Sequence, residues 1–120
     1  MGAFVVTFPT ATIQLATTPG TDLYTCPAGV RARITKLTVL NTTATARTVT
    51  IHLARAAEAN ADKNQIVSAE PVPIETTAPM GVEIFCAEGQ VLNPTDVLRA
   101  LSDGASGAAL TAFGSVVEFT

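Results

Sequence analysis

The sequence predicts an all-β domain, either a sandwich or a barrel, from three observations. Short stretches of alternating Val, Ile, Leu and Thr recur between Gly, Pro, Asn and Asp residues, at the spacing of roughly 8–12 residues that such folds show. Thr occurs 19 times, and its β-branched side chain suits a half-buried pleated surface. No stretch carries the apolar stripe of a long amphipathic helix. The 120 residues suffice for one compact domain, and a hydrophobic content of 48% excludes a disordered chain.

The first elements are two candidate strands, residues 3–8 and 11–16, separated by Pro9. Proline cannot donate to a β-ladder, so Pro9 belongs at a sheet edge or a bend. The first strand is apolar on both faces. We therefore expect residues 1–16 to form an N-terminal arm or an edge strand. We also expect the first strand to extend to a neighbouring copy or another protein instead of completing its own sheet. The residues that this contact would use are Phe4, Val5, Val6 and Phe8.

A β-hairpin is the clearest element, with strands at residues 30–40 and 47–55 and a loop at residues 41–46. In the second strand, apolar residues and Thr alternate regularly. In the first strand the apolar positions change parity near Thr35, so we expect a bulge there. With this loop as the turn, the expected pairs are Val39 with Val49 and Leu37 with Ile51.

Residues 54–64 are rich in Ala and predict one or two helical turns or a surface loop. The strand around Arg99 is apolar on both faces, which in a two-layer sandwich indicates a central strand under a covering loop or a subunit interface. Such an interface would use Val97, Leu98, Arg99 and Leu101. The remaining candidate strands are residues 22–26, 65–69, 72–76, 81–87, 96–102, 108–113 and 115–119, with turns at 93–96 and 103–107.

Charged residues make up only 14% of the chain, against roughly 25% in an ordinary soluble domain, so we expect partners to cover much of the surface. The net charge of −3 argues against a nucleic-acid partner and is unevenly divided. Residues 23–57 hold five basic residues and no acidic one, whereas residues 58–120 hold two basic and nine acidic ones. Two interpretations remain open. Neighbouring strands exchange these charges as cross-strand pairs, or a basic face that includes Arg31 and Arg33 docks an acidic face of another copy or an acidic lattice.

The sequence offers no catalytic or metal-ligating constellation. His52, the single histidine, lies on the Thr side of a regular strand, where we expect it at the surface. Cys26 and Cys86 match no zinc or redox spacing, so we expect free, buried thiols unless the fold brings the two together as a disulfide. The apolar runs are too short to cross a membrane. We expect no enzyme activity, no cofactor, no metal site, and neither a membrane nor a nucleic acid as partner.

Four segments together resemble a pattern that recurs in small structural proteins of tailed bacteriophages. They read DLYTCPAGVRA at residues 22–32, ITKLTVLN at 34–41, TVTIHL at 48–53 and VLNPTDVLRA at 91–100. Where a Gly-Asp turn is usual in that pattern, this chain has Thr95 and Asp96. The resemblance covers roughly residues 21–120, and it implies an antiparallel, jelly-roll-like β-sandwich of about eight short strands that comprises residues 1–120 as one domain.

The same resemblance implies a non-enzymatic virion structural protein that is assembled in the host cytoplasm. We expect a capsid decoration (cement) protein, whose partners are the major capsid protein or tail subunits. We also expect a homo-oligomer, with a trimer as one option. Alternatives are a tail, baseplate or fibre-associated subunit, or a carbohydrate-binding attachment module. The absence of Trp and the single Tyr argue against the carbohydrate-binding alternative, because sugar rings usually stack on exposed aromatic side chains.

Overall fold

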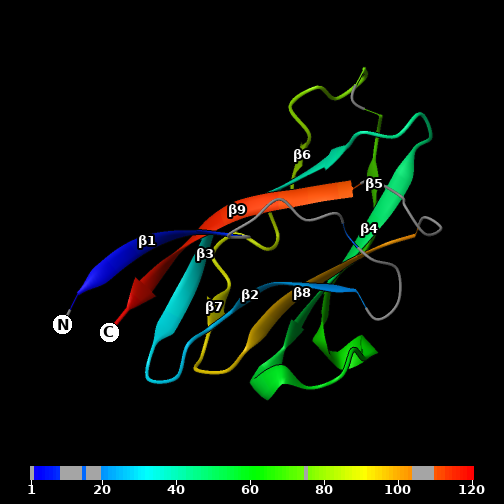
Figure 1. The fold of residues 1–120 in the computed structure, drawn as a ribbon. Helices are drawn as coiled ribbons and strands as arrows, with labels where there is room; N and C mark the ends of the chain where they lie inside the picture. The colour runs from blue at the N-terminus through cyan, green and yellow to red at the C-terminus, as the bar shows by residue number, and fades with distance from the viewer. Residues whose placement is uncertain (1, 9–14, 16–19, 75, 104–109) are drawn as a thin grey trace.

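The computed structural model describes residues 2–8, 15, 20–74, 76–103 and 110–120, which form two antiparallel sheets packed face to face (Figure 1). The predicted all-β sandwich is confirmed. The strands are β1 (Ala3–Phe8), β2 (Thr21–Thr25), β3 (Arg31–Asn41), β4 (Arg47–Ala54), β5 (Gln65–Val72), β6 (Val82–Glu83), β7 (Val91–Leu92), β8 (Val97–Ser102) and β9 (Leu110–Phe119).

The connections between the strands follow the jelly-roll topology. One sheet has the order β1-β9-β3-β6, with β7 also paired to β3, and the other has the order β2-β8-β4-β5. The pairs β1 with β9, β2 with β8, β3 with β6 and β7, and β4 with β5 are successive parts of one long antiparallel ribbon. Because the ribbon is folded over, these pairs alternate between the two sheets, and β3 then lies beside β9 and β4 beside β8.

Small aliphatic side chains fill the space between the sheets, because alternate residues of each strand point inward. Two aromatic rings, Phe8 of β1 and Tyr24 of β2, pack in the core with 6.1 Å between their centroids. The Tyr24 hydroxyl donates a 2.5 Å hydrogen bond to Glu118 and so links the two sheets. Burial, and then this hydrogen bond, raise the pKa of Tyr24. The largest fully buried apolar side chains are Ile34, Leu37, Val39, Val49, Ile51, Val72, Leu92, Leu98, Leu110 and Val116.

The bulge expected near Thr35 is present. The register of β3 against β9 shifts between Ile34 and Lys36, and Thr35 donates a 3.0 Å hydrogen bond to the backbone carbonyl of Ser115. The shift lets the apolar residues on both sides of Thr35 face the core. Next to the bulge lies Gly114, which pairs with Leu37 and where a Cβ atom would stand 2.0 Å from the Lys36 carbonyl oxygen. The two strands approach each other this closely only because residue 114 has no side chain.

The predicted hairpin is wrong: β3 and β4 lie in different sheets and do not pair. Both edges of β3 are occupied, by β9 on one side and by β6 and β7 on the other, and β4 lies between β8 and β5. The loop at residues 42–46 extends to about 17 Å, which exceeds the roughly 10 Å between packed sheets. A short loop between two alternating strands therefore crosses the sandwich as readily as it closes a hairpin.

Other boundaries also differ from the prediction. The two expected C-terminal strands form the single strand β9, residues 81–87 keep only β6, and the two-residue β7 was not predicted. Among the described residues of 72–76, which exclude residue 75, the structure has only the end of β5 and an isolated bridge from Ile74 to Asn41. Residues 54–64 contain two single 3-10 turns, Arg55–Ala57 and Asp62–Asn64. The candidate strand at 11–16 and the turn at 103–107 lie outside the described residues, apart from Leu15 and Asp103.

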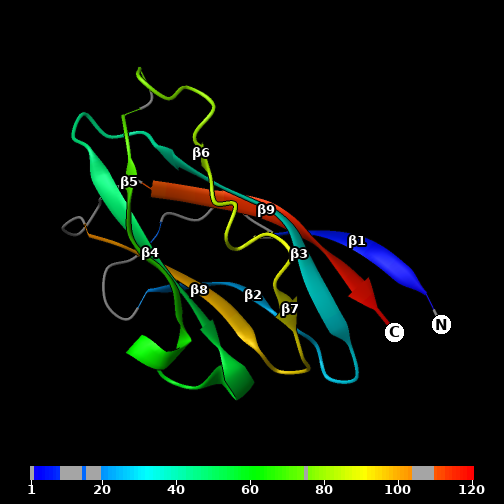
Figure 2. The same ribbon diagram turned by 180° about the vertical axis from the view of Figure 1, so that it is seen from behind.

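Of the two forms expected for the N-terminal segment, β1 has that of an edge strand, and the expectation that it would leave its own sheet uncompleted is wrong. It pairs with β9 without interruption from Ala3, opposite Phe119, to Phe8, opposite Gly114. Phe8 is buried in the core, while Phe4 and Val5 remain exposed. The hydrogen bonds available along β9 explain why these residues stay with their own domain, where β1 forms an edge strand (Figures 1 and 2).

Gly114→Ala should lower the free energy of unfolding by about 3 kcal/mol, because the added methyl group meets backbone atoms that cannot move without opening the β3–β9 pairing. Urea unfolding measures the change. The matched control is Gly29→Ala, where the methyl group meets no atom within 4 Å and only the backbone conformation at φ 76° costs about 1 kcal/mol. Equal losses in the two variants would contradict the close approach at Gly114.

Candidate functional site

The outer face of the five-stranded sheet brings apolar residues and arginines together. Antiparallel register places Val5, Val117, Arg33 and Val91 side by side on four adjacent strands, β1, β9, β3 and β7. A second row follows the same pattern with Phe119 beside Arg31. Neighbours in such rows share one face of a sheet. We call the six residues Val5, Arg31, Arg33, Val91, Val117 and Phe119 the arginine face.

The arginine face is exposed and its charges are unpaired. Val5 is 74% exposed, Val91 47% and Phe119 46%. Both arginines are exposed as well, and in the described part of the chain neither takes part in an ion pair. Apolar side chains of this size gathered around free guanidinium groups are typical of a surface that another molecule covers, because isolated exposed apolar residues are common but patches are not.

An open hollow of about 460 Å³ deepens one side of the arginine face, between Arg33, Glu88 and Phe119. Its rim is made by the turn that carries Gly89, whose N–H donates a 2.7 Å hydrogen bond to the Ile34 carbonyl at the edge of β3. Burial, and then a hydrogen bond with Glu83, raise the pKa of Glu88. Glu88 thus lies beside Arg33 at the border of the arginine face.

The predicted interface residues fall into three groups. Val5, Arg31 and Arg33 lie on the arginine face, and Phe4 is exposed on the other side of β1. Phe8, Val97 and Leu98 are buried, so these three are wrong as interface residues. Val6 is half-buried against the core. Arg99 and Leu101 are half-buried in β8, which lies between two other strands. A central strand was one of the two interpretations that the sequence left open for this segment.

A polar row crosses the four-stranded sheet beneath the loop at residues 55–64. Register aligns Asp22, Arg99 and His52 on β2, β8 and β4. Arg99 donates hydrogen bonds of 2.6 Å to Asp22 and 2.8 Å to Asn60. Arg99 and Asp22 therefore form an ion pair between neighbouring strands, as one of the two interpretations of the charge distribution expects. The guanidinium group of Arg99 also donates to the Glu58 carbonyl, and these bonds hold the loop against the sheet.

The expectation that His52 lies at the surface is wrong. The loop covers His52, which is 5% exposed, and its Nδ1 lies 2.7 Å from Oδ1 of Asn64. Asn64 Oδ1 also accepts the N–H of Ala61, and its Nδ2 donates to the Ala59 carbonyl, so we assign Nδ1 of His52 as the donor. The amide oxygen and the amide nitrogen of Asn64 are both used within the protein, so this contact holds the loop against β4.

Asp96 holds the same end of the sandwich together, and the sequence did not single it out. Its buried carboxylate accepts hydrogen bonds from the Arg55 guanidinium at 2.5 Å and from the backbone N–H groups of Ala56 and Asn93 at 2.9 and 2.8 Å. Burial alone would raise the pKa of Asp96, but these bonds outweigh it and hold the pKa below its ordinary value.

The Asp96 cluster also stabilises left-handed backbone in residues other than glycine. Ala56 has φ 51° and Ala57 φ 57°, and Thr95 has φ 71°. A β-branched residue in this region is strained. Thr95 stands where the resembled pattern has glycine, which adopts such a conformation freely.

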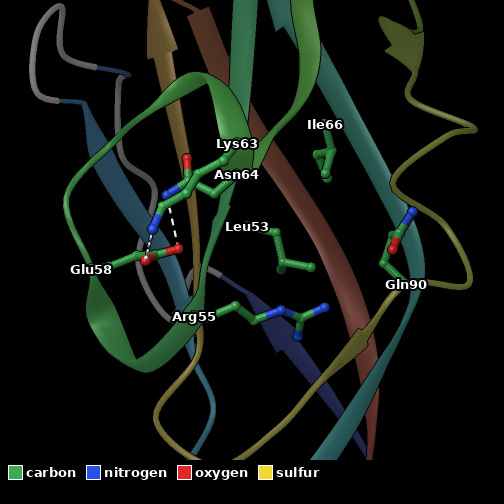
Figure 3. A pocket seen from close by; sticks show the side chains of 7 residues that line it. All are labelled: Leu53, Arg55, Glu58, Lys63, Asn64, Ile66 and Gln90. Carbon is green, nitrogen blue, oxygen red and sulfur yellow. Dashed lines mark hydrogen bonds and ion pairs between the residues drawn. The ribbon is translucent and has the colours of Figure 1, made fainter.

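The end of the sandwich next to this cluster holds an open hollow of about 410 Å³ (Figure 3). Leu53 and Ile66 provide apolar surface, and Arg55, Lys63 and Gln90 stand around them. These polar groups are already engaged: Arg55 with Asp96, Lys63 with Glu58 and Gln90 with the Cys86 carbonyl. None of the seven lining residues is aromatic. The hollow therefore offers no stacking surface for a sugar ring and no free charge for an anion.

Neither cysteine forms a disulfide, and the two differ in exposure. Cys26 is buried, and burial raises the pKa of its thiol, whereas Cys86 is exposed, against the expectation that both are buried. Within the described ranges, no three His, Cys, Asp or Glu side chains come close enough to hold a metal ion. Among the same residues, no helix has the length and apolar character needed to span a membrane.

Comparisons with protein-family models, with curated proteins and with solved structures find no match for this chain.

Asp96→Asn should lower the free energy of unfolding by about 2 kcal/mol at pH 7, because hydrogen bonds to a charged acceptor are replaced by bonds to an amide. The pKa of Asp96 in the folded protein lies below its ordinary value, so the stability that its charge contributes is complete above about pH 5 and is lost as the pH falls through the folded-state pKa. Urea unfolding at a series of pH values should show the two proteins converging under acid conditions. Asp62→Asn, at an exposed position, is the control. If Asp96→Asn remained less stable than the unaltered protein at low pH, the stabilisation would not come from the charge of Asp96.

Thr95→Gly should raise the free energy of unfolding by about 1 kcal/mol, since it relieves the left-handed strain at φ 71°. Thermal unfolding is a sufficient measurement. Thr76→Gly, at an exposed turn position without a positive φ, should instead lower stability slightly through the greater entropy of the unfolded chain. A loss of stability at both positions would show that the Thr95 backbone is not strained.

Proposed function

We propose that this chain is a non-enzymatic structural subunit of a tailed-bacteriophage virion, specifically a capsid decoration protein that docks through its arginine face onto an acidic, partly apolar surface of the major capsid protein. The observation that carries the proposal is the pair of unpaired arginines, Arg31 and Arg33, set among exposed apolar side chains on a sheet. The jelly-roll topology supports it, because capsid proteins commonly use this fold, although the fold alone assigns no function.

The chemistry of the arginine face suits a protein partner. Interface centres are enriched in arginine and aromatic residues, and here Arg31 lies beside Phe119 while Arg33 lies between Val117 and Val91. A guanidinium group binds a carboxylate through two parallel hydrogen bonds, and its flat faces tolerate apolar neighbours. Docking would therefore bury the apolar rows and pair both charges in one step.

The charge distribution supports an acidic partner. The unpaired arginines lie in the stretch of residues 23–57 that holds five basic residues and no acidic one. Within this stretch, Arg55 forms an ion pair with Asp96 beside the loop at residues 55–64. Arg31 and Arg33 have no ion-pair partner in the described part of the chain. Complementary charge would orient the subunit and speed its association with the shell.

Arg33→Glu should weaken binding to capsid shells that lack this protein by at least about 30-fold, because a like charge would be buried against the acidic partner. Co-sedimentation of purified protein with such shells measures the affinity. The matched control is Lys63→Glu, which makes the same charge change at a 74% exposed side chain beyond the other sheet.

Unchanged binding of Arg33→Glu, or equal losses in the two variants, would contradict docking through the arginine face. Binding to purified tails but never to heads would overturn the decoration function in favour of a tail, baseplate or fibre-associated subunit.

A further inference from the structure

The sandwich has several exposed edges, and most carry a feature that discourages pairing with another chain. Native sheets protect their edges with short strands, bulges, prolines or charges. β6 and β7 are two residues long. β5 contains Glu70 and Pro71, and its register against β4 shifts twice. β2 carries Asp22 next to a register shift.

β1 carries none of these features. Its six residues read AFVVTF, without a charge or a proline, and its pairing with β9 is regular from end to end. It is the outermost strand of the five-stranded sheet, and within the described residues no strand pairs with its other side. The backbone N–H and C=O groups along that side are therefore open to a further strand.

The side chains of β1 also indicate that a further strand lies along its open edge. Phe4 is 58% exposed and Val5 is 74% exposed, and they lie on opposite faces of the strand because successive residues alternate. A partner lying only on the outer face would cover Val5 and leave Phe4 exposed. A strand added along the edge contacts both.

We propose that β1 pairs edge to edge with β1 of a second copy of this chain, in antiparallel orientation, and joins the two five-stranded sheets into one continuous sheet. A second copy fits because an antiparallel pair of identical strands is self-complementary and closes at two copies around a twofold axis. The partner strand is equally uncharged, so no charge is buried.

This arrangement extends the proposed docking surface. A twofold axis perpendicular to the sheet keeps both arginine faces on the same side, so a dimer presents two of them to one partner surface. The β3 strands of the two copies are five strand spacings apart, about 24 Å. That distance exceeds the Debye length of about 8 Å at physiological salt, so the arginines of the two copies repel each other little.

The test is the mass of the purified full-length chain in solution, by sedimentation equilibrium. The expected result is a dimer of the 12.3 kDa chain. Phe4→Lys should raise the dimer dissociation constant at least about tenfold, because a charge at a sheet edge opposes strand pairing. The matched control is Phe113→Lys, the same change at a 44% exposed residue of β9, which is not an edge strand; it should dimerise as the unaltered chain does.

A monomer or a trimer of the unaltered chain would overturn the proposal, as would equal association of Phe4→Lys and the unaltered protein. Hydrogen exchange gives a second reading that needs no variant: the amides of residues 3–8 should exchange more slowly as the protein concentration rises. Concentration-independent exchange there would also overturn the pairing. Since no virion protein takes part, failure here is distinguishable from failure of docking to the shell.

Discussion

The position of β9 between β1 and β3 is the constraint on which the rest of the structure depends. β9 pairs with β3 along nearly its whole length and with β1 over all six residues of that strand. This pairing places Val117 and Phe119 beside Arg33 and Arg31, and it leaves β1 as the outer edge of the sheet. The bulge at Thr35 keeps both halves of β3 facing the core, and Gly114 lets the two strands approach each other. The arginine face and the open edge of β1, on which the two proposals rest, both follow from the position of this one strand.

The abundance of Ala and Thr, 20 and 19 residues, has a structural reason in this arrangement. Ala32, Ala100 and Ala112 are buried between the sheets, where larger side chains on the neighbouring strands fill the available space. Several Thr residues, such as Thr48 and Thr50, lie half-buried on the outer side of the four-stranded sheet. Both residue types make compact, weakly charged surfaces. The few charged residues therefore stand out. The basic ones around the loop at residues 55–64 form ion pairs, whereas the arginines of the arginine face form none with the described residues.

Local features of the sequence predicted most of the strands, because alternation along a strand depends only on which face is buried. The parity change near Thr35 predicted the bulge for the same reason. Partner strands were not predictable in this way: β3 and β4 have the pattern of a hairpin, and only the competition of β9 and β8 for their edges separates them. His52 looked exposed because the cover that buries it is a loop held by Asn64, twelve residues away. Asp96 had no motif for this role, since two of its three donors, Arg55 and Ala56, lie about forty residues earlier in the chain.

The orientation of this protein on an assembled particle tests the central claim most directly, and an electron cryomicroscopy map of the virion would show it. If the arginine face docks onto the shell, the five-stranded sheet faces the shell, with Arg31 and Arg33 beside carboxylate groups of the partner, while the loop at residues 55–64 remains in solvent. A map in which the arginine face points into solvent and the four-stranded sheet or that loop makes the contact would contradict it.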